Sequence, residues 1–157
     1  MVLRISSPEI KTTLAELMPI IKEKLSLGQS VSIFPNGTSM LPMLRQGIDS
    51  VILSPLPQKL KKYDLPLYRR DNGQFVLHRI VKAGDDYTCM GDNQFAEEKG
   101  IRHDQMIAVV TSFTRGEKKH SVEEFPYRLY CRLWYHSRHL RHFWRRGIGF
   151  LYRRLHK

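Results

Sequence analysis

Six short runs of β-type residues, separated by turn residues, constrain most strongly what this chain can fold into. Their cores lie at 31–34, 50–53, 65–68, 75–81, 87–90 and 107–113. β-branched and aromatic residues suit a pleated, half-buried surface, and short strands at this spacing are typical of all-β domains. We therefore predict a mainly β domain over residues 29–125, built as a coiled antiparallel sheet or partly open barrel.

An amphipathic helix is predicted before the β domain, within residues 1–28. Ser7-Pro8-Glu9 is a helix-start signal and Gly28 ends the segment. Between them, apolar residues recur at helical spacing at Ile10, Leu14, Leu17, Met18, Ile21 and Leu25. Charged residues interrupt this pattern, so the segment is too polar to span a membrane. We expect the helix to pack on the β domain, and binding of a leader peptide or partner is the alternative.

The composition changes after Glu124, the last acidic residue. Residues 126–157 carry nine Lys and Arg, so this tail accounts for most of the formal net charge of +11. Aromatic residues interleave with the arginines at helical spacing, which predicts a basic helix able to lie on an anionic membrane. The expected contacts are Arg138, Arg141, Trp144, Arg145 and Arg146. A protein partner, a solvated face and, as a weaker alternative, single-stranded nucleic acid stay open.

The two cysteines, Cys89 and Cys131, lie far apart in the sequence without Cys-x-x-Cys spacing. This pattern predicts neither a disulfide framework nor a zinc site. We expect Cys89 to be a buried strand residue and Cys131 to be a packed thiol.

Neither a secretory signal-peptide pattern nor a run of ~20 mainly apolar residues is visible in the sequence. The expected location is therefore cytoplasmic, at the periphery of the membrane if the tail binds lipid.

The candidate chemistry centres on residues 37–42, Gly-Thr-Ser-Met-Leu-Pro, a turn that can present the Ser39 hydroxyl at the rim of a β domain. A serine hydroxyl needs a neighbouring base to act as a nucleophile. His78 lies in a β-type run, and an imidazole that titrates near pH ~6.5 can accept this proton. Asp92 and Glu98 rank equally as the carboxylate that would orient His78.

Three ordered motifs resemble the superfamily of type I signal peptidases and LexA-type repressor autoproteases. They are Gly-x-Ser-Met-x-Pro-x-Leu at 37–44, His-Arg-Ile-Val at 78–81 and Gly-Asp-Asn at 91–93. The similarity covers roughly residues 30–112 and implies the superfamily's fold. It also implies Ser39 as nucleophile and His78 as base, as in the branch with the endoplasmic-reticulum, archaeal and sporulation-type enzymes. In that branch the catalytic aspartate lies several residues beyond the Gly-Asp-Asn turn, where this chain has Glu98.

The predicted oxyanion site departs from this family pattern. Many bacterial relatives have a hydroxyl two residues before the nucleophile, where this chain has Gly37. The backbone N–H groups of the Ser39 turn and the Thr38 hydroxyl are the remaining candidate donors, and loss of one donor can cost ~2.7–4 kcal/mol. Met40 and Pro42 complete the turn.

The resemblance implies a serine endopeptidase that cleaves a leader- or signal-type peptide by acyl transfer and needs no metal or organic cofactor. Two other classes stay open: a LexA-like regulator that cleaves itself or binds nucleic acid, and a peptide-binding relative without turnover. No helix-turn-helix pattern precedes the β domain, which counts against the regulator. The purely structural alternative is that Ser39 caps a turn, His78 is a strand histidine and Asp92 forms an Asx turn.

Overall fold

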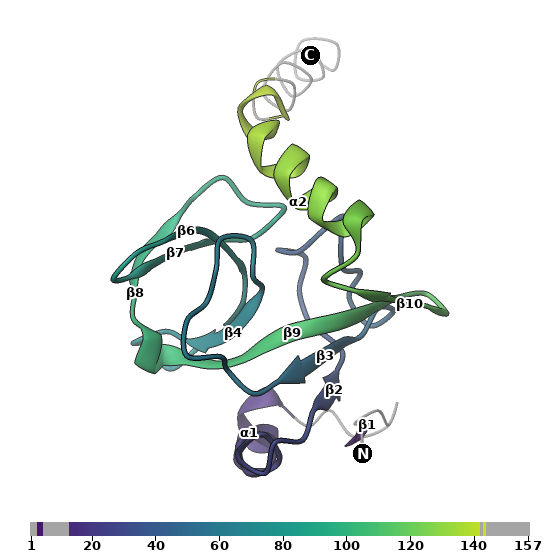
Figure 1. Cartoon of the computed structure of the whole chain (residues 1–157), viewed down its shortest axis with the longest axis vertical. Coiled ribbons are helices and arrows are strands. Elements are labelled where there is room, and N and C mark those ends of the chain that lie inside the picture. The colour runs from purple at the N-terminus through teal and green to yellow at the C-terminus, as the bar shows by residue number, and fades with distance from the viewer. Residues whose placement is uncertain (1–2, 5–12, 142, 144–157) are drawn as a thin grey trace, which may run out of the picture.

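The structure is a computed structural model that describes residues 3–4, 13–141 and 143. The helix-start signal at 7–9, Ile10, Trp144, Arg145 and Arg146 lie outside the described residues. The elements are β1 (Leu3–Arg4), α1 (Leu14–Ser26), β2 (Val31–Ile33), β3 (Val51–Ser54), β4 (Pro66–Arg69), β5 (Phe75–Leu77), β6 (Arg79–Ala83), β7 (Tyr87–Met90), β8 (Glu98–Ile101), the 3₁₀ turn η1 (His103–Gln105), β9 (Met106–Arg115), β10 (Lys118–Ser121) and α2 (Phe125–His136) (Figure 1).

The strands form two sheets. The larger sheet has the order β1-β2-β3-β9-β4-β5, and β10 also pairs with β9, while the smaller sheet has the order β6-β7-β8. All neighbours are antiparallel except β1 and β2. The predicted mainly β class with a curled antiparallel sheet is therefore confirmed.

The long strand β9 organises the larger sheet, because it pairs with β3, β4 and β10 (Figure 1). The register shifts on both inner partners of β9, between Ile52 and Leu53 and between Leu67 and Tyr68. Such bulges bend strands and increase their twist, which accounts for the curl of the sheet.

The run 75–81, predicted as one strand, is divided at His78. β5 pairs with β4 in the larger sheet, whereas β6 pairs with β7 in the smaller one. His78 lies at the point where the chain passes between the two sheets, and this transfer interrupts the strand. The sequence also failed to predict β8 and β10, whose charged residues are typical of exposed strands.

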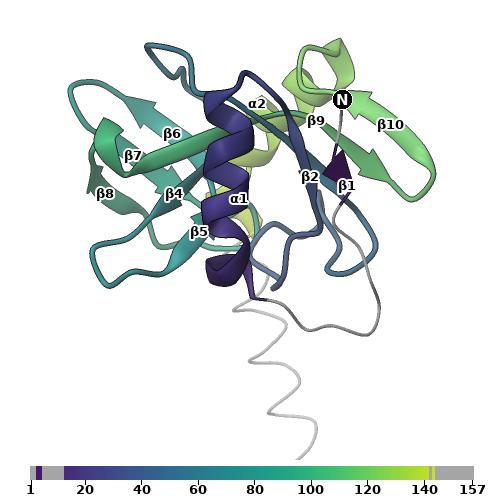
Figure 2. The same cartoon turned by 90° about the horizontal axis from the view of Figure 1, so that it is seen from below.

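Helix α1 packs on the larger sheet, as expected. It buries Met18, Ile21 and Leu25, and Figure 2 shows it lying across the sheet. The helix begins after Thr13, whose hydroxyl accepts from the Glu16 N–H at 3.3 Å while the Glu16 carboxylate accepts from the Thr13 N–H at 2.9 Å. This capping box, absent from the prediction, sets the helix start.

Helix α2 docks on the β domain through one side. Tyr127 and Cys131 are buried in the same core as Ile21, Val51 and Val110. Cys131 is thus a packed thiol and Cys89 a buried residue of β7, as predicted. Among the described residues, no helix has both the length and the apolar character needed to cross a membrane.

Candidate active site

Buried side chains of the turn itself anchor the Ser39 turn in the core. Met40, Met43 and Leu44 are buried, whereas Ser39 is half-buried at the surface of the turn. The Leu44 N–H donates to the Met40 carbonyl at 2.9 Å, and the Leu41 N–H donates to the Thr38 carbonyl at 3.2 Å. The chain therefore fixes the backbone of Ser39 and leaves its side chain at the surface.

The start and end of this turn have special backbone geometry. Gly37 has a φ of +97°, a conformation that favours glycine, and the Leu41–Pro42 peptide bond is cis. Arg115 donates to the carbonyl of Met43 at 2.7 Å and also to that of Pro42. The predicted turn residues are thus part of one ordered loop tied to β9.

His78 is buried, with its Nδ1 facing a carboxylate. Nδ1 lies 2.9 Å from Glu98 Oε1 and 3.3 Å from the Tyr68 hydroxyl. Because the carboxylate accepts, we assign the proton to Nδ1, which leaves the lone pair of Nε2 free to act as a base. A neutral imidazole in this tautomer is the form required for general-base catalysis.

The other ring nitrogen of His78 and the Ser39 turn both lie close to Gly91. A Cβ built on Gly91 would lie 3.1 Å from His78 Nε2 and 2.7 Å from the Ser39 carbonyl oxygen. Gly91 therefore packs next to both the imidazole and the Ser39 turn, and it leaves no room for a side chain.

We predict that Gly91→Ala lowers kcat/KM by about 100-fold or more, because either His78 or Ser39 must shift to make room for the new methyl group. The measurement is the rate of peptide cleavage by purified variants. Gly84→Ala is the matched control, since its Cβ would contact only the Asp86 carbonyl, at 3.7 Å. Wild-type cleavage by Gly91→Ala would contradict the proposed arrangement.

Glu98 is itself held by Arg70. The Arg70 Nε donates to Glu98 Oε2 at 2.7 Å, and the Arg70 Nη2 donates to Oε1. Burial acts to raise the pKa of Glu98, but the net shift is downward from the ordinary value, and the hydrogen bonds from Arg70 are its largest lowering cause. Glu98 is therefore ionised at neutral pH and oriented towards the imidazole.

Burial lowers the pKa of His78 from its ordinary value of 6.5, and the charge of Glu98 opposes this shift. As the candidate base, His78 must be neutral, so we predict that kcat/KM falls on the acid side with a midpoint below pH 6.5. The positive charge of Arg70 also lowers the pKa of His78. Arg70→Gln should therefore move the acid limb of a kcat/KM profile to higher pH, and a shift to lower pH would contradict this assignment.

Asp92, ranked equally with Glu98 from the sequence, has other partners. Its two oxygens accept from the Arg79 guanidinium, both at 2.8 Å, and the Tyr130 hydroxyl donates to Oδ2 at 3.1 Å. The structure thus places Glu98 against the imidazole and Asp92 in a buried ion pair.

The Gly-Asp-Asn turn still serves the site, through Asn93. The Asn93 N–H donates to the Ser39 carbonyl at 2.8 Å, and its side-chain amide donates to the Thr38 carbonyl at 3.1 Å. The ion pair of Asp92 with Arg79 fixes the loop on which Asn93 sits. Asp92 is therefore placed to order the Ser39 turn through Asn93, without contacting His78 or Ser39 itself.

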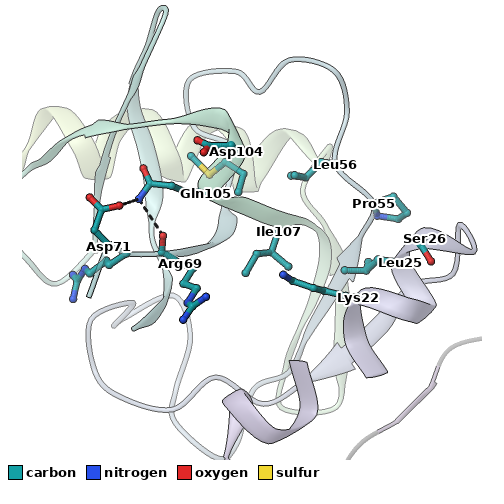
Figure 3. Close-up of a pocket in the computed structure, with 12 residues that line it drawn as sticks. Lys22, Leu25, Ser26, Pro55, Leu56, Arg69, Asp71, Asp104, Gln105 and Ile107 are labelled. Atoms are coloured by element: carbon teal, nitrogen blue, oxygen red, sulfur yellow. Dashed lines mark hydrogen bonds between the residues drawn. The ribbon is translucent and has the colours of Figure 1, made fainter. Parts of the chain in front are cut away.

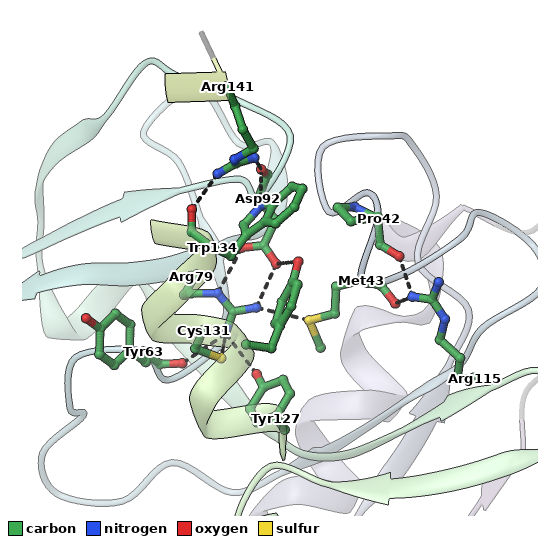
Figure 4. A network of polar contacts seen from close by, with 11 residues as sticks. Pro42, Met43, Tyr63, Arg79, Asp92, Arg115, Tyr127, Cys131, Trp134 and Arg141 are labelled. Carbon is green, nitrogen blue, oxygen red and sulfur yellow. Dashed lines mark hydrogen bonds and ion pairs between the residues drawn. The ribbon is translucent and has the colours of Figure 1, made fainter. Parts of the chain in front are cut away.

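Side chains on the inner side of α2 complete the polar network around Arg79 and Asp92 (Figure 4). Arg79 donates to the Tyr127 hydroxyl and to the Cys131 sulfur, both at 2.9 Å. The Trp134 indole donates to the Asp92 carbonyl at 2.7 Å. The sequence did not predict this role for the tail.

Two of the predicted membrane contacts are engaged within the protein. The Arg141 guanidinium lies 3.5 Å from the centre of the Trp134 ring and donates to the Asp92 carbonyl at 3.4 Å. Arg138 lies over Tyr135 and reaches Glu97 at 3.4 Å. Both arginines therefore pair with the domain, which the sequence-based assignment to a membrane surface did not anticipate.

Ser39 and His78 line a cavity of about 210 Å³. One wall is β5, an edge strand of the larger sheet, and the other is the loop 35–37. Arg70 and Gln94 also line this cavity. The candidate nucleophile and base therefore share a cavity with β5, which has β4 as its one partner among the strands of the described residues.

A larger cavity of about 640 Å³ lies elsewhere, between α1 and the ends of β4 and β9 (Figure 3). Its lining includes Lys22, Asp71 and Gln105, and Gln105 donates to the Asp71 carboxylate at 3.1 Å. Neither Ser39 nor His78 lines it, so its size gives it no part in the candidate chemistry.

Within the part of the chain that the structure describes, no three His, Cys, Asp or Glu side chains are grouped as metal ligands. Comparison of the chain with models of protein families, with curated proteins and with solved structures found no match.

Proposed function

We propose that this chain is a serine endopeptidase of the signal peptidase and LexA type, with Ser39 as nucleophile, His78 as base and Glu98 as the residue that orients the base. The observation that carries this proposal is the two-sided placement of His78. Its Nδ1 lies 2.9 Å from Glu98, while its Nε2 and the Ser39 carbonyl oxygen both lie close to Gly91, at 3.1 Å and 2.7 Å from a Cβ built there.

The proposed reaction is acyl transfer. The Ser39 Oγ attacks the scissile carbonyl carbon, and His78 Nε2 takes the hydroxyl proton, so that a tetrahedral oxyanion forms. His78 then gives this proton to the leaving amine as the C–N bond breaks. Water, activated by the same nitrogen, releases the acyl group from Ser39. Glu98 stabilises the imidazolium that exists between these transfers, and backbone N–H groups of the Ser39 turn are the candidate oxyanion donors.

The proposed substrate is an extended peptide. The free edge of β5 can pair with such a peptide through backbone hydrogen bonds, which is a common mode of peptide recognition. The cavity at this edge is small, about 210 Å³, which favours small side chains next to the cleaved bond. Together with the family resemblance, this supports a leader- or signal-type peptide as the substrate class.

The test is a comparison of protein N-termini in cells that carry either the wild-type chain or Ser39→Ala. The peptidase proposal expects a set of new N-termini that is lost in the variant and that defines the cleavage site. An unchanged set, with both proteins folded and expressed at equal levels, would overturn catalysis and leave a binding protein.

A further inference from the structure

The outer side of α2 carries apolar residues that the protein does not bury. Phe125, Leu129 and Leu133 lie on α2, and Leu140 and Phe143 follow beyond its end at His136. The five side chains are between 42% and 76% exposed. At 3.6 residues per turn, the positions 125, 129 and 133 follow one another along a single face of the helix. We call these five residues the outer stripe.

The other side of the helix already has its partners. Tyr127 and Cys131 are buried in the core, and Tyr130 and Trp134 bind Asp92. The outer stripe is thus a second apolar face, separate from the one that docks the helix. Contiguous exposed apolar surface of this kind marks an interaction site.

The charge beside the outer stripe is positive. Arg128 and Arg132 are exposed and lie one residue before Leu129 and Leu133. The sequence from Phe125 to Phe143 contains no Asp or Glu. An apolar stripe flanked by arginines matches an anionic bilayer, whose headgroups attract the basic residues while the apolar side chains enter the acyl boundary.

From these observations we propose that the outer stripe, with Arg128 and Arg132, is a membrane-binding surface for anionic lipid. Single-stranded nucleic acid fits less well, because three of the five stripe residues are leucines, on which bases do not stack. Tyr127, Tyr130 and Trp134 are turned towards Arg79 and Asp92. The stripe therefore presents three leucines and two phenylalanines, a set that suits the acyl boundary of a bilayer.

The outer stripe begins on α2, and the inner side of the same helix contacts the loop next to the candidate active site. The inner side of α2 binds the Asp92 loop, and Asn93 of that loop holds the Ser39 carbonyl. The proposal of a lipid surface does not depend on peptidase activity and is tested without it.

The experiment is co-sedimentation of the full chain with vesicles of phosphatidylcholine alone or mixed with phosphatidylglycerol. We expect binding to the mixed vesicles and little binding to phosphatidylcholine. The variant L129Q/L133Q should reduce the partition coefficient by at least about tenfold, because two exposed leucines no longer enter the bilayer. The variant R128Q/R132Q should reduce it by about 30-fold through the loss of two charges near the surface.

Two control variants test whether vesicle binding is specific to the outer stripe and its two arginines, or arises from any exposed apolar or basic residue. Leu27→Gln removes an exposed leucine at the C-cap of α1, and K118Q/K119Q removes two exposed charges on β10. Both should bind mixed vesicles like the wild type, and all four variants should keep the wild-type unfolding temperature because the changed side chains are exposed. Absence of vesicle binding, or an equal loss in the controls, would overturn the proposal. Self-association or oligonucleotide binding that L129Q/L133Q abolishes, without vesicle binding, would assign the stripe to that partner instead.

Discussion

Ser39→Ala and His78→Ala are each expected to lower kcat/KM by about 10⁶-fold. In a serine enzyme whose nucleophile and base act as one unit, removal of either group costs nearly the whole covalent pathway. For the same reason, the double variant should be little slower than either single variant. The measurement is single-turnover cleavage of a synthetic peptide that spans the cleavage site found in cells.

The controls for this prediction separate chemistry from folding. Ser39 is half-buried on a turn, so Ser39→Ala should keep the unfolding temperature of the wild type. His78 is buried, and His78→Gln is therefore the better partner variant because it keeps most of the side-chain volume. Ser26→Ala, on α1, controls for serine loss and should cleave at the wild-type rate. Losses that multiply in the double variant would show that Ser39 and His78 act independently.

The strands of the larger sheet could be predicted from local pattern, because β-branched and aromatic runs end at turn residues. The predicted cores at 31–34, 50–53 and 107–113 fall on β2, β3 and β9. The break at His78 could not be predicted, since the run 75–81 has uniform strand character. The break results from the pairing of its two halves with different sheets, which is a tertiary effect.

From the sequence, the residues of the candidate site could be predicted better than the contacts between them. Ser39 and His78 line one cavity, as the motifs indicated. The choice between Asp92 and Glu98 depends on the register of β8 on β7, where Glu98 lies opposite Cys89, and spacing along the chain does not fix that register. Arg70 carries no sequence signal at all, because the β4–β5 turn brings it to Glu98 across 28 positions.

For the tail as well, the sequence predicts the element but not its contacts. Its pattern correctly predicts an amphipathic helix, but α2 has two apolar sides and the sequence does not say which one faces the domain. The aromatic side binds Arg79 and Asp92 because these buried ionic groups need hydrogen-bond donors and acceptors, which tyrosine and tryptophan supply. The side with Phe125, Leu129 and Leu133 is the one left exposed.

Glu98 and Asp92, which ranked equally from the sequence, should affect different properties when each is replaced by its amide. Glu98→Gln is expected to lower kcat by about 10⁴-fold, because an amide no longer selects the Nδ1–H tautomer or stabilises the imidazolium. Its effect on stability should be small, since Arg70 and Glu98 are both partly exposed and the arginine can be hydrated. The loss should therefore be seen in kcat with an almost unchanged unfolding temperature.

Asp92→Asn should instead destabilise the fold. The Arg79 side chain is 3% exposed, and removal of its counter-charge leaves a buried charge unpaired, which costs about 3–5 kcal/mol. For a domain of this size, that cost corresponds to a fall in unfolding temperature of about 10 °C. Cleavage measured well below the new unfolding temperature should stay within about tenfold of the wild type, because Asp92 does not contact the imidazole or the nucleophile. Thermal unfolding and single-turnover cleavage of both variants test this assignment. A 10⁴-fold loss of kcat in Asp92→Asn at wild-type stability, together with a near-normal rate in Glu98→Gln, would show that Asp92 and not Glu98 orients His78.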